Sequence, residues 1–316
     1  MQRNLTLDGM KVMLAFMVVG IHAGFLNEIS NIGNILTTQG IFRIAVPIFF
    51  IINGYYFSAS NRGELLKWCS RLLSLYAFWL LIYSYSWLKL GDVNLKNIAL
   101  LIKEVLFGYH HLWYLSATFG GGICVYFLRY NRKVLYIFAG VAYLVGVAIQ
   151  YVGNYHLFEG TLLDKVFNYS FVHRNFLFLG LPFFSVGVAI KQYSIDSYFS
   201  KTFLLSTVFL GLLLLGIESY WNYLNDSSGG GYDNYLTLII ICPSLFVLAL
   251  RSTSTTSIKV LTSLSTSIYL IHPIWIDALN QFFKFGSVQV TVIVILLSSL
   301  SAMVLIRAQK KWKFVL

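Results

Sequence analysis

Stretches of about 20 mostly apolar residues recur along this chain, and a run of that length is enough for a helix to cross a bilayer. Only 11% of the residues are charged, 58% are hydrophobic and the mean hydropathy is +0.72, whereas a soluble domain carries about 25% charged residues. Backbone polar groups inside lipid must be satisfied within the protein, so these runs predict an all-α, polytopic membrane helix bundle. We expect ten transmembrane helices, at residues 8–26, 41–59, 69–89, 112–129, 134–151, 174–191, 202–220, 235–250, 260–279 and 288–307.

The chain contains no long hydrophilic block, internal repeat or low-complexity tract. We therefore expect residues 1–316 to form a single integral membrane domain without an additional extracytoplasmic domain. Its three cysteines, Cys69, Cys124 and Cys242, fall in or beside apolar runs and form no spaced pairs. This pattern indicates neither a disulfide framework nor a metal site.

The distribution of Lys and Arg sets the expected orientation, because basic residues concentrate in cytoplasmic segments. With the N-terminus inside, 15 of the 23 basic residues fall on the cytoplasmic side, and the opposite loops collect most of the acidic residues. The prediction is therefore a cytoplasmic N-terminus and a cytoplasmic C-terminus. The net charge of +11 is then mostly topological, so we expect no nucleic-acid partner. The same basic segments could also serve an anionic cytosolic ligand.

The first apolar segment carries three ionisable residues, Asp8, Lys11 and His22. Eleven steps at 100° place Lys11 and His22 on nearly the same helix face, about 16 Å apart along the axis. Ionisable groups inside a membrane span are costly, and they mark functional candidates. The alternative is that Lys11 and His22 reach the headgroups at opposite interfaces.

Polar residues at the starts or outer halves of other expected helices fall at the level of His22. Each has a structural alternative: the arginines could anchor helix ends, His111 and still more His110 could be interfacial, and Asn53–Gly54 could be a packing notch. Together they predict a polar path through the bundle with its chemistry near the outer face. The residues at this level are Arg43, His111, Trp113, Arg174, Asn175 and His272.

Four segments resemble the signatures of the acyltransferase 3 family of integral membrane acyltransferases. The start NLTLDGMKVMLAFMVVGIH resembles the family's opening, a basic residue followed after ten positions by His, although Lys11 stands where Arg is usual. RIAVPIFFIINGYYF resembles the second-helix motif, with Asn53 in place of its usual Ser. HLWYL and YLIHP are similar to later signatures, so the resemblance covers the chain from end to end.

The resemblance implies acyl transfer, usually of acetyl from cytosolic acetyl-CoA to a glycan on the far side of the membrane. It implies a catalytic role for His22, with Lys11 and Arg43 supporting it. Relatives that modify glycans lie in the bacterial inner membrane and act on lipopolysaccharide, capsule or common antigen. The residues expected to bind substrate are Asp8, Asn53, His111, Trp113, Arg174, Asn175, Tyr269 and His272.

This chemistry agrees with the residues. A histidine near neutral pKa can take the proton of an acceptor hydroxyl, or it can carry the acetyl group itself. Arginines or a hydroxyl could stabilise the developing oxyanion. The phosphates of acetyl-CoA require cations, and two basic cytoplasmic loops could supply them. The residues expected to bind the donor are Arg62, Lys67, Arg71, Arg129, Arg132 and Lys133.

Two other classes of function remain open. A transporter or flippase would also need a polar path through the bundle, although no inverted repeat or paired broken helices are visible. A non-catalytic assembly partner for glycan synthesis would not depend on His22. We expect membrane lipids and a glycan or lipid-linked saccharide as partners, and a homo-oligomer is compatible with the sequence.

Overall fold

The computed structural model describes residues 3–88, 94–225, 231–256 and 260–316, and this part of the chain is mainly helical. Arg3–Asn4 (β1) pairs antiparallel with Thr255–Thr256 (β2), which ties the start of the chain to the segment before α14. The α-helices are α1 (Leu5–Ala23), α2 (Asn31–Thr38), α3 (Ala45–Tyr56), α4 (Arg62–Ile82), α5 (Ser84–Trp87), α6 (Leu95–Phe107), α7 (Trp113–Leu128), α8 (Arg132–Asn154), α9 (Leu162–Phe167), α10 (Ser170–His173), α11 (Leu181–Gln192), α12 (Lys201–Asn225), α13 (Leu238–Leu250), α14 (Val260–Phe282) and α15 (Ser287–Gln309). Short helical turns are η1 (Ile41–Ile44), η2 (His110–Leu112), η3 (Phe176–Gly180, a π-helix) and η4 (Ile195–Ser197).

Within the described residues, six helical segments are long and apolar enough to cross a membrane: Leu5–Ala23, Asn31–Tyr56, Arg62–Ile82, Arg132–Asn154, Lys201–Asn225 and Ser287–Gln309. Phe176–Gln192 and Leu238–Leu250 are shorter apolar helices. The two remaining expected spans coincide with α7 and α14. The protein is therefore a helical membrane protein, and each of the ten expected segments overlaps a helix.

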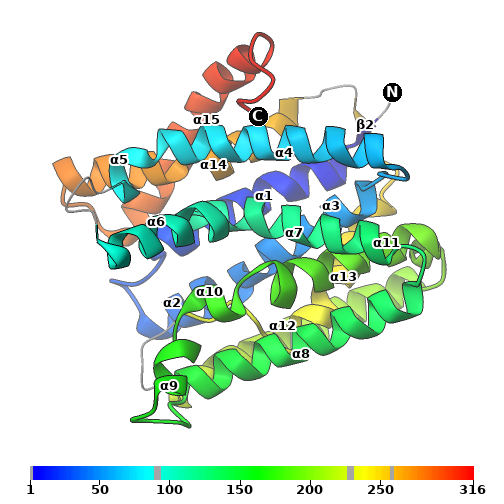
Figure 1. Ribbon diagram of the computed structural model, residues 1–316, viewed down its shortest axis with the longest axis horizontal. Helices are drawn as coiled ribbons and strands as arrows, with labels where there is room; N and C mark the ends of the chain where they lie inside the picture. The colour runs from blue at the N-terminus through cyan, green and yellow to red at the C-terminus, as the bar shows by residue number, and fades with distance from the viewer. Residues whose placement is uncertain (1–2, 89–93, 226–230, 257–259) are drawn as a thin grey trace.

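The long helices lie side by side in one bundle, and in the view of Figure 1 α1, α3, α7 and α11 lie between α4 and α8, with the end of α15 above α4. A large apolar core joins side chains from most of these helices. At the centre, Gly54 of α3 faces Gly187 of α11, and a Cβ on either residue would collide with backbone of the other helix. Small residues allow this close approach, so the packing notch expected at Asn53–Gly54 is present.

Arg62, Lys67 and Arg71 were expected in a basic loop, and this prediction is wrong. All three residues lie on the first three turns of α4. Asn61 caps this helix by accepting a hydrogen bond from the Glu64 amide at 3.0 Å, which is the usual role of Asn at an N-cap. The helix therefore starts seven residues before the apolar run begins at residue 69. Its first two turns present cations on a helical surface.

Candidate active site

Four histidine rings meet at one end of the bundle, and we call them the histidine cluster: His22, His110, His111 and His272. The ring centroid of His22 lies 4.4 Å from that of His110 and 5.2 Å from that of His272. The ring of His111 lies 5.2 Å from that of His272. His22 lies in the last turn of α1 and His272 lies in α14. His110 and His111 lie in η2. Residues far apart in the sequence thus build one imidazole cluster.

The cluster has an open side and a closed side. His111 and His272 are buried, with 1% and 0% of their surface exposed, whereas His22 is half-buried and His110 is exposed. The more accessible side of the cluster is therefore the side formed by His22 and His110. Sequence reasoning treated His110 as an interfacial residue, and its contact with His22 was not foreseen. His110 also adopts a φ of +48°, and such conformations of non-glycine residues concentrate at functional sites.

The hydrogen-bond partners of His272 indicate which of its two ring nitrogens carries the hydrogen. Its Nδ1 lies 2.8 Å from the Tyr269 carbonyl oxygen and 3.2 Å from that of Ile268, so Nδ1 carries the hydrogen and donates it. Its Nε2 has no hydrogen-bond partner among the described residues. Nε2 therefore carries an in-plane lone pair, on a ring whose centroid lies 5.2 Å from that of His22.

Arg43 and Arg174 meet on a different group, the carboxylate of Asp233. Arg43 Nη1 lies 2.6 Å from Asp233 Oδ1, and Arg174 Nη1 lies 3.2 Å from Oδ2. Gln150 accepts hydrogen bonds from the amides of Asp233 and Asn234 at 2.9 Å and 3.0 Å. This bridge fastens the segment after residue 230 to η1 and to the start of η3. Sequence reasoning placed both arginines at this level but did not single out Asp233 or Gln150.

The other residues expected at this level serve the local structure. The guanidinium of Arg174 lies over the ring of Trp113, 5.0 Å from its centroid. Asn175 is the N-cap of η3 and accepts from the amides of Leu177 and Phe178 at 2.9 Å and 3.1 Å. Asn at this position explains why the chain re-enters a helix there.

Lys11 and Asp8 pair at the other end of α1. Lys11 Nζ lies 3.0 Å from Asp8 Oδ1, and both side chains are largely buried. Thr262 of α14 donates to the same carboxylate oxygen at 2.8 Å. The ion pair therefore joins α1 to α14 inside the bundle, where a charge needs a partner.

Lys11 lines an inner cavity of about 340 Å³, together with Asn53, Tyr114 and Thr118. Asn53 donates to the Tyr114 hydroxyl at 2.5 Å. A smaller cavity of about 70 Å³ shares Phe49, Tyr114, Leu115, Ser265 and Thr266 with it and also reaches Tyr269. The Tyr269 hydroxyl donates to the carbonyl oxygen of His111 at 2.5 Å. Two adjoining cavities thus extend from Lys11 to the residue that contacts the histidine cluster.

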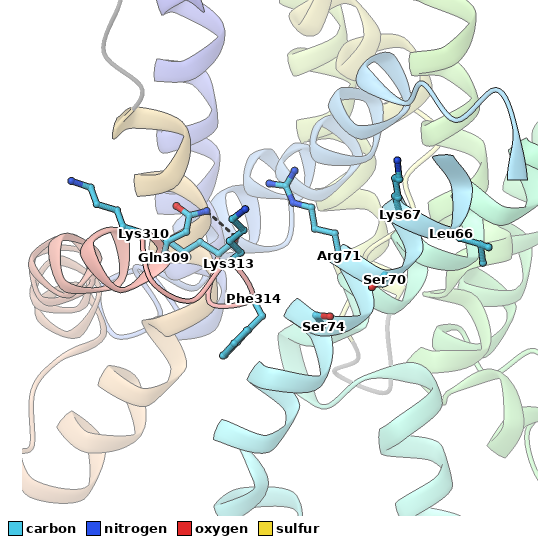
Figure 2. A pocket seen from close by; sticks show the side chains of 10 residues that line it. Leu66, Lys67, Ser70, Arg71, Ser74, Gln309, Lys310, Lys313 and Phe314 are labelled. Carbon is cyan, nitrogen blue, oxygen red and sulfur yellow. Dashed lines mark hydrogen bonds between the residues drawn. The ribbon is translucent and has the colours of Figure 1, made fainter. Parts of the chain in front are cut away.

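A larger cavity of about 1070 Å³, which we call the basic pocket, lies between α4 and the end of α15. Figure 2 shows Lys67, Ser70, Arg71 and Ser74 on α4 facing the residues that follow α15. Lys310 and Lys313 also line the pocket, and sequence reasoning used them only for orientation. The basic run after residue 306 was the signal that could have identified them. The basic pocket and the inner cavity share Arg71 and Leu316.

The other residues expected to bind the donor lie elsewhere. Arg129 and Arg132 line a separate cavity of about 370 Å³ between α7, α8 and α11. Arg129 stacks on the rings of Tyr126 and Tyr130, at 3.7 Å and 4.2 Å from their centroids. Arg62 and Lys133 line neither this cavity nor the basic pocket. The two groups of cations therefore do not form one site.

No group of three or more His, Cys, Asp or Glu side chains in the described segments is arranged to hold a metal ion. The ring of His22 is tilted by 43° and 32° against those of His110 and His272, and the rings of His111 and His272 meet edge to face at 64°.

Comparison with known proteins defines the class. The model of the acyltransferase 3 family, described as an acyltransferase domain, matches residues 4–308. The chain therefore belongs to this family of acyltransferase domains.

Two curated relatives carry other names. A serine/alanine racemase of Enterococcus gallinarum is 30% identical over 303 residues, which cover 86% of this chain and 40% of that protein. An amino-acid racemase of Enterococcus faecalis is 26% identical over 296 residues, which cover 88% of this chain and 42% of that protein. The chain thus spans about two fifths of the length of these relatives. No solved structure gives a significant match.

Proposed function

We propose that this protein moves a short acyl group, most simply acetyl, from acetyl-CoA at the basic pocket to a hydroxyl of a surface glycan or lipid-linked saccharide at the histidine cluster. One observation carries the proposal. Three cavities that share lining residues extend from the basic pocket to Tyr269, whose hydroxyl bonds to the backbone of His111. A donor with an anionic head and a long thioester arm fits such a series of cavities.

The cations of the basic pocket suit the phosphates of CoA. Lys67, Arg71, Lys310 and Lys313 surround the cavity, and ion pairs with phosphate are among the stronger polar contacts. Ser70 and Ser74 add hydroxyl donors on the same face of α4. The thioester arm then passes Arg71 into the inner cavity beside Lys11.

Acyl transfer at the histidine cluster can follow two routes. His22 takes the proton of the acceptor hydroxyl, and the oxygen attacks the thioester carbonyl carbon. The tetrahedral intermediate collapses, the carbon–sulfur bond breaks, and the proton passes to the leaving thiolate, which departs as the CoA thiol. In the alternative route His22 attacks first, releases the thiol and then passes the acyl group to the hydroxyl. His22 is half-buried whereas His111 and His272 are buried, which supports His22 as the reacting member of the cluster.

We further propose that the basic pocket faces the cytoplasm of a bacterial cell and that the protein crosses the inner membrane ten times. The bias of basic residues supports this orientation. Reporter fusions after Arg62, Arg132 and Lys311 should then report the cytoplasm, and fusions near Asp92 and Asp226 should report the other side. A reversed pattern at two of these positions would contradict the orientation.

The racemase names of the relatives favour a second candidate, a carrier for a small polar cargo such as a free amino acid. The deciding experiment uses purified protein in vesicles with labelled acetyl-CoA and crude surface glycan, and in parallel with labelled serine. Release of CoA with label on the glycan supports the enzyme. Serine uptake without acyl transfer supports the carrier and overturns the proposal.

A further inference from the structure

The last residues of the described chain form a strap across the basic pocket. Residues 312–316, which we call the strap, follow α15 and lie against α4. The Trp79 indole donates to the Val315 carbonyl at 3.0 Å, and Gln309 donates to the Leu316 carbonyl at 2.8 Å. The ring of Phe314 lies 5.4 Å from that of Phe78. The strap is therefore fixed to two helices at once.

The two ends of the strap differ in burial. Trp312 and Phe314 are 48% and 43% exposed, whereas Val315 and Leu316 are 3% and 6% exposed. Val315 and Leu316 belong to the main apolar core, although they follow a run of lysines. Burial of these two aliphatic side chains stabilises this position of the strap. The strap is thus held with its last side chains directed into the bundle.

Leu316 lies where two cavities meet. Of the residues that line the basic pocket, Arg71 and Leu316 also line the inner cavity. We call this junction the neck. One side of the neck is formed by Arg71, whose long charged side chain can extend toward solvent. The other side is formed by Leu316, whose branched apolar side chain is packed in the core.

We propose that Leu316 determines which acyl groups pass from the basic pocket to the inner cavity, and that it is therefore a specificity-determining residue. The inference rests on the proposed function, because it takes an acyl-CoA as the donor. The inner cavity itself is large enough for more than an acetyl group, at about 340 Å³. The restriction to short chains is accordingly imposed at the neck.

Donor chain length is the first test. The ratio of kcat/KM for butyryl-CoA to that for acetyl-CoA should rise about tenfold in Leu316→Ala, since one or two methylenes in an apolar site change discrimination by roughly this factor. The same ratio should fall below the wild-type value in Leu316→Phe. Leu81→Ala, the same change at a side chain of α4 that is 70% exposed, should leave the ratio unchanged. An unchanged ratio in Leu316→Ala, measured on folded protein, overturns the proposal.

A second test does not depend on acyl transfer. Thr118 lines the inner cavity but not the basic pocket, so Thr118→Cys in a background with Cys69, Cys124 and Cys242 replaced by Ser reports access to that cavity. Leu316→Ala should increase the labelling rate of the introduced thiol by a bulky methanethiosulfonate about tenfold, with little change for the methyl reagent.

The two tests separate the possible failures. A changed labelling rate in a protein without acyl transfer contradicts the proposed function and leaves the neck in place. Acyl transfer with unchanged chain-length ratios and unchanged labelling contradicts the role of Leu316.

Discussion

The imidazole of His22 lies against that of His110, with 4.4 Å between the ring centroids, although 87 residues separate them in the sequence. His22 ends a helix that carries Lys11 at its other end, and His110 lies in a short turn with a positive φ. The two rings are tilted by 43°, and aromatic pairs at this spacing attract one another. The position of His22 thus depends on a turn that the sequence did not mark.

His22→Ala should reduce glycan acylation by at least about 10²-fold, because it removes either the general base or the acyl carrier. The protein should still insert and fold, since the His22 side chain is half-buried and makes ring contacts only. The measurement is acylation at matched membrane levels, with His156→Ala as a control at a distant histidine. Wild-type activity in His22→Ala would contradict the proposed mechanism and would favour a carrier or a non-catalytic assembly partner.

Lys11→Met should cost most of the activity and some stability, because it leaves the buried carboxylate of Asp8 without the ammonium 3.0 Å away. Loss of one partner of a buried pair commonly costs about 3–5 kcal/mol. Lys11→Arg restores the cation usual in the family, but the planar guanidinium needs a different geometry toward Asp8 and Thr262. Acylation and thermal stability of both variants should be compared. Full activity of Lys11→Met would exclude a role for this charge.

Arg71→Glu should raise the KM for acetyl-CoA about tenfold or more, because Arg71 lines both the basic pocket and the inner cavity. The effect should shrink with a donor that lacks the 3′-phosphate and at high salt, where exposed charges are screened. Arg129→Glu is the matched control, since Arg129 lines a separate cavity. Equal increases in KM for the two variants would show that the donor responds to overall charge and not to the basic pocket.

Asp233→Asn should lower the free energy of unfolding by about 3 kcal/mol, because the largely buried guanidinium of Arg43 and the partly buried guanidinium of Arg174 lose their shared carboxylate. Arg43→Ala should have a similar effect, and the double variant should cost less than the sum of the two. Melting temperature in detergent measures the change, with Glu159→Gln, an exposed carboxylate, as the control. A fall in kcat at unchanged melting temperature in Arg43→Ala would instead support the catalytic role expected from the sequence.

Stability should fall on acidification below pH 6.5. Burial lowers the pKa of His173 from its ordinary 6.5 to about 4, so between these values the unfolded chain binds a proton that the folded chain does not. Folding stability is therefore complete above pH 6.5 and decreases as the pH falls toward 4. Asp233 adds a loss of the same sign at lower pH: burial alone would raise its pKa, but Arg174 and Arg43 hold the pKa below its ordinary value. His173→Gln should make the decrease between pH 6.5 and 4.5 smaller, and an unchanged decrease would contradict a contribution from His173.

Much of the bundle follows from local sequence. The apolar runs locate ten helical segments, because length and hydropathy are properties of neighbouring residues. The spacing of Lys11 and His22 follows from helix geometry alone. Helix starts were less predictable: α4 begins at Arg62, ahead of its apolar run, because the Asn61 cap and not hydrophobicity starts it.

The sequence by itself determined the class of protein, the helices and the level of the ionisable residues along them. Which of those residues meet was decided by tertiary structure, since rotation of each helix and the path of each connection depend on packing partners distant in the chain. Arg43 and Arg174 share the level of His22, yet they turn to Asp233, while His110 turns to His22. The basic pocket likewise required the end of α15 to fold back onto α4, a contact between residues more than 200 positions apart that apolar periodicity does not encode.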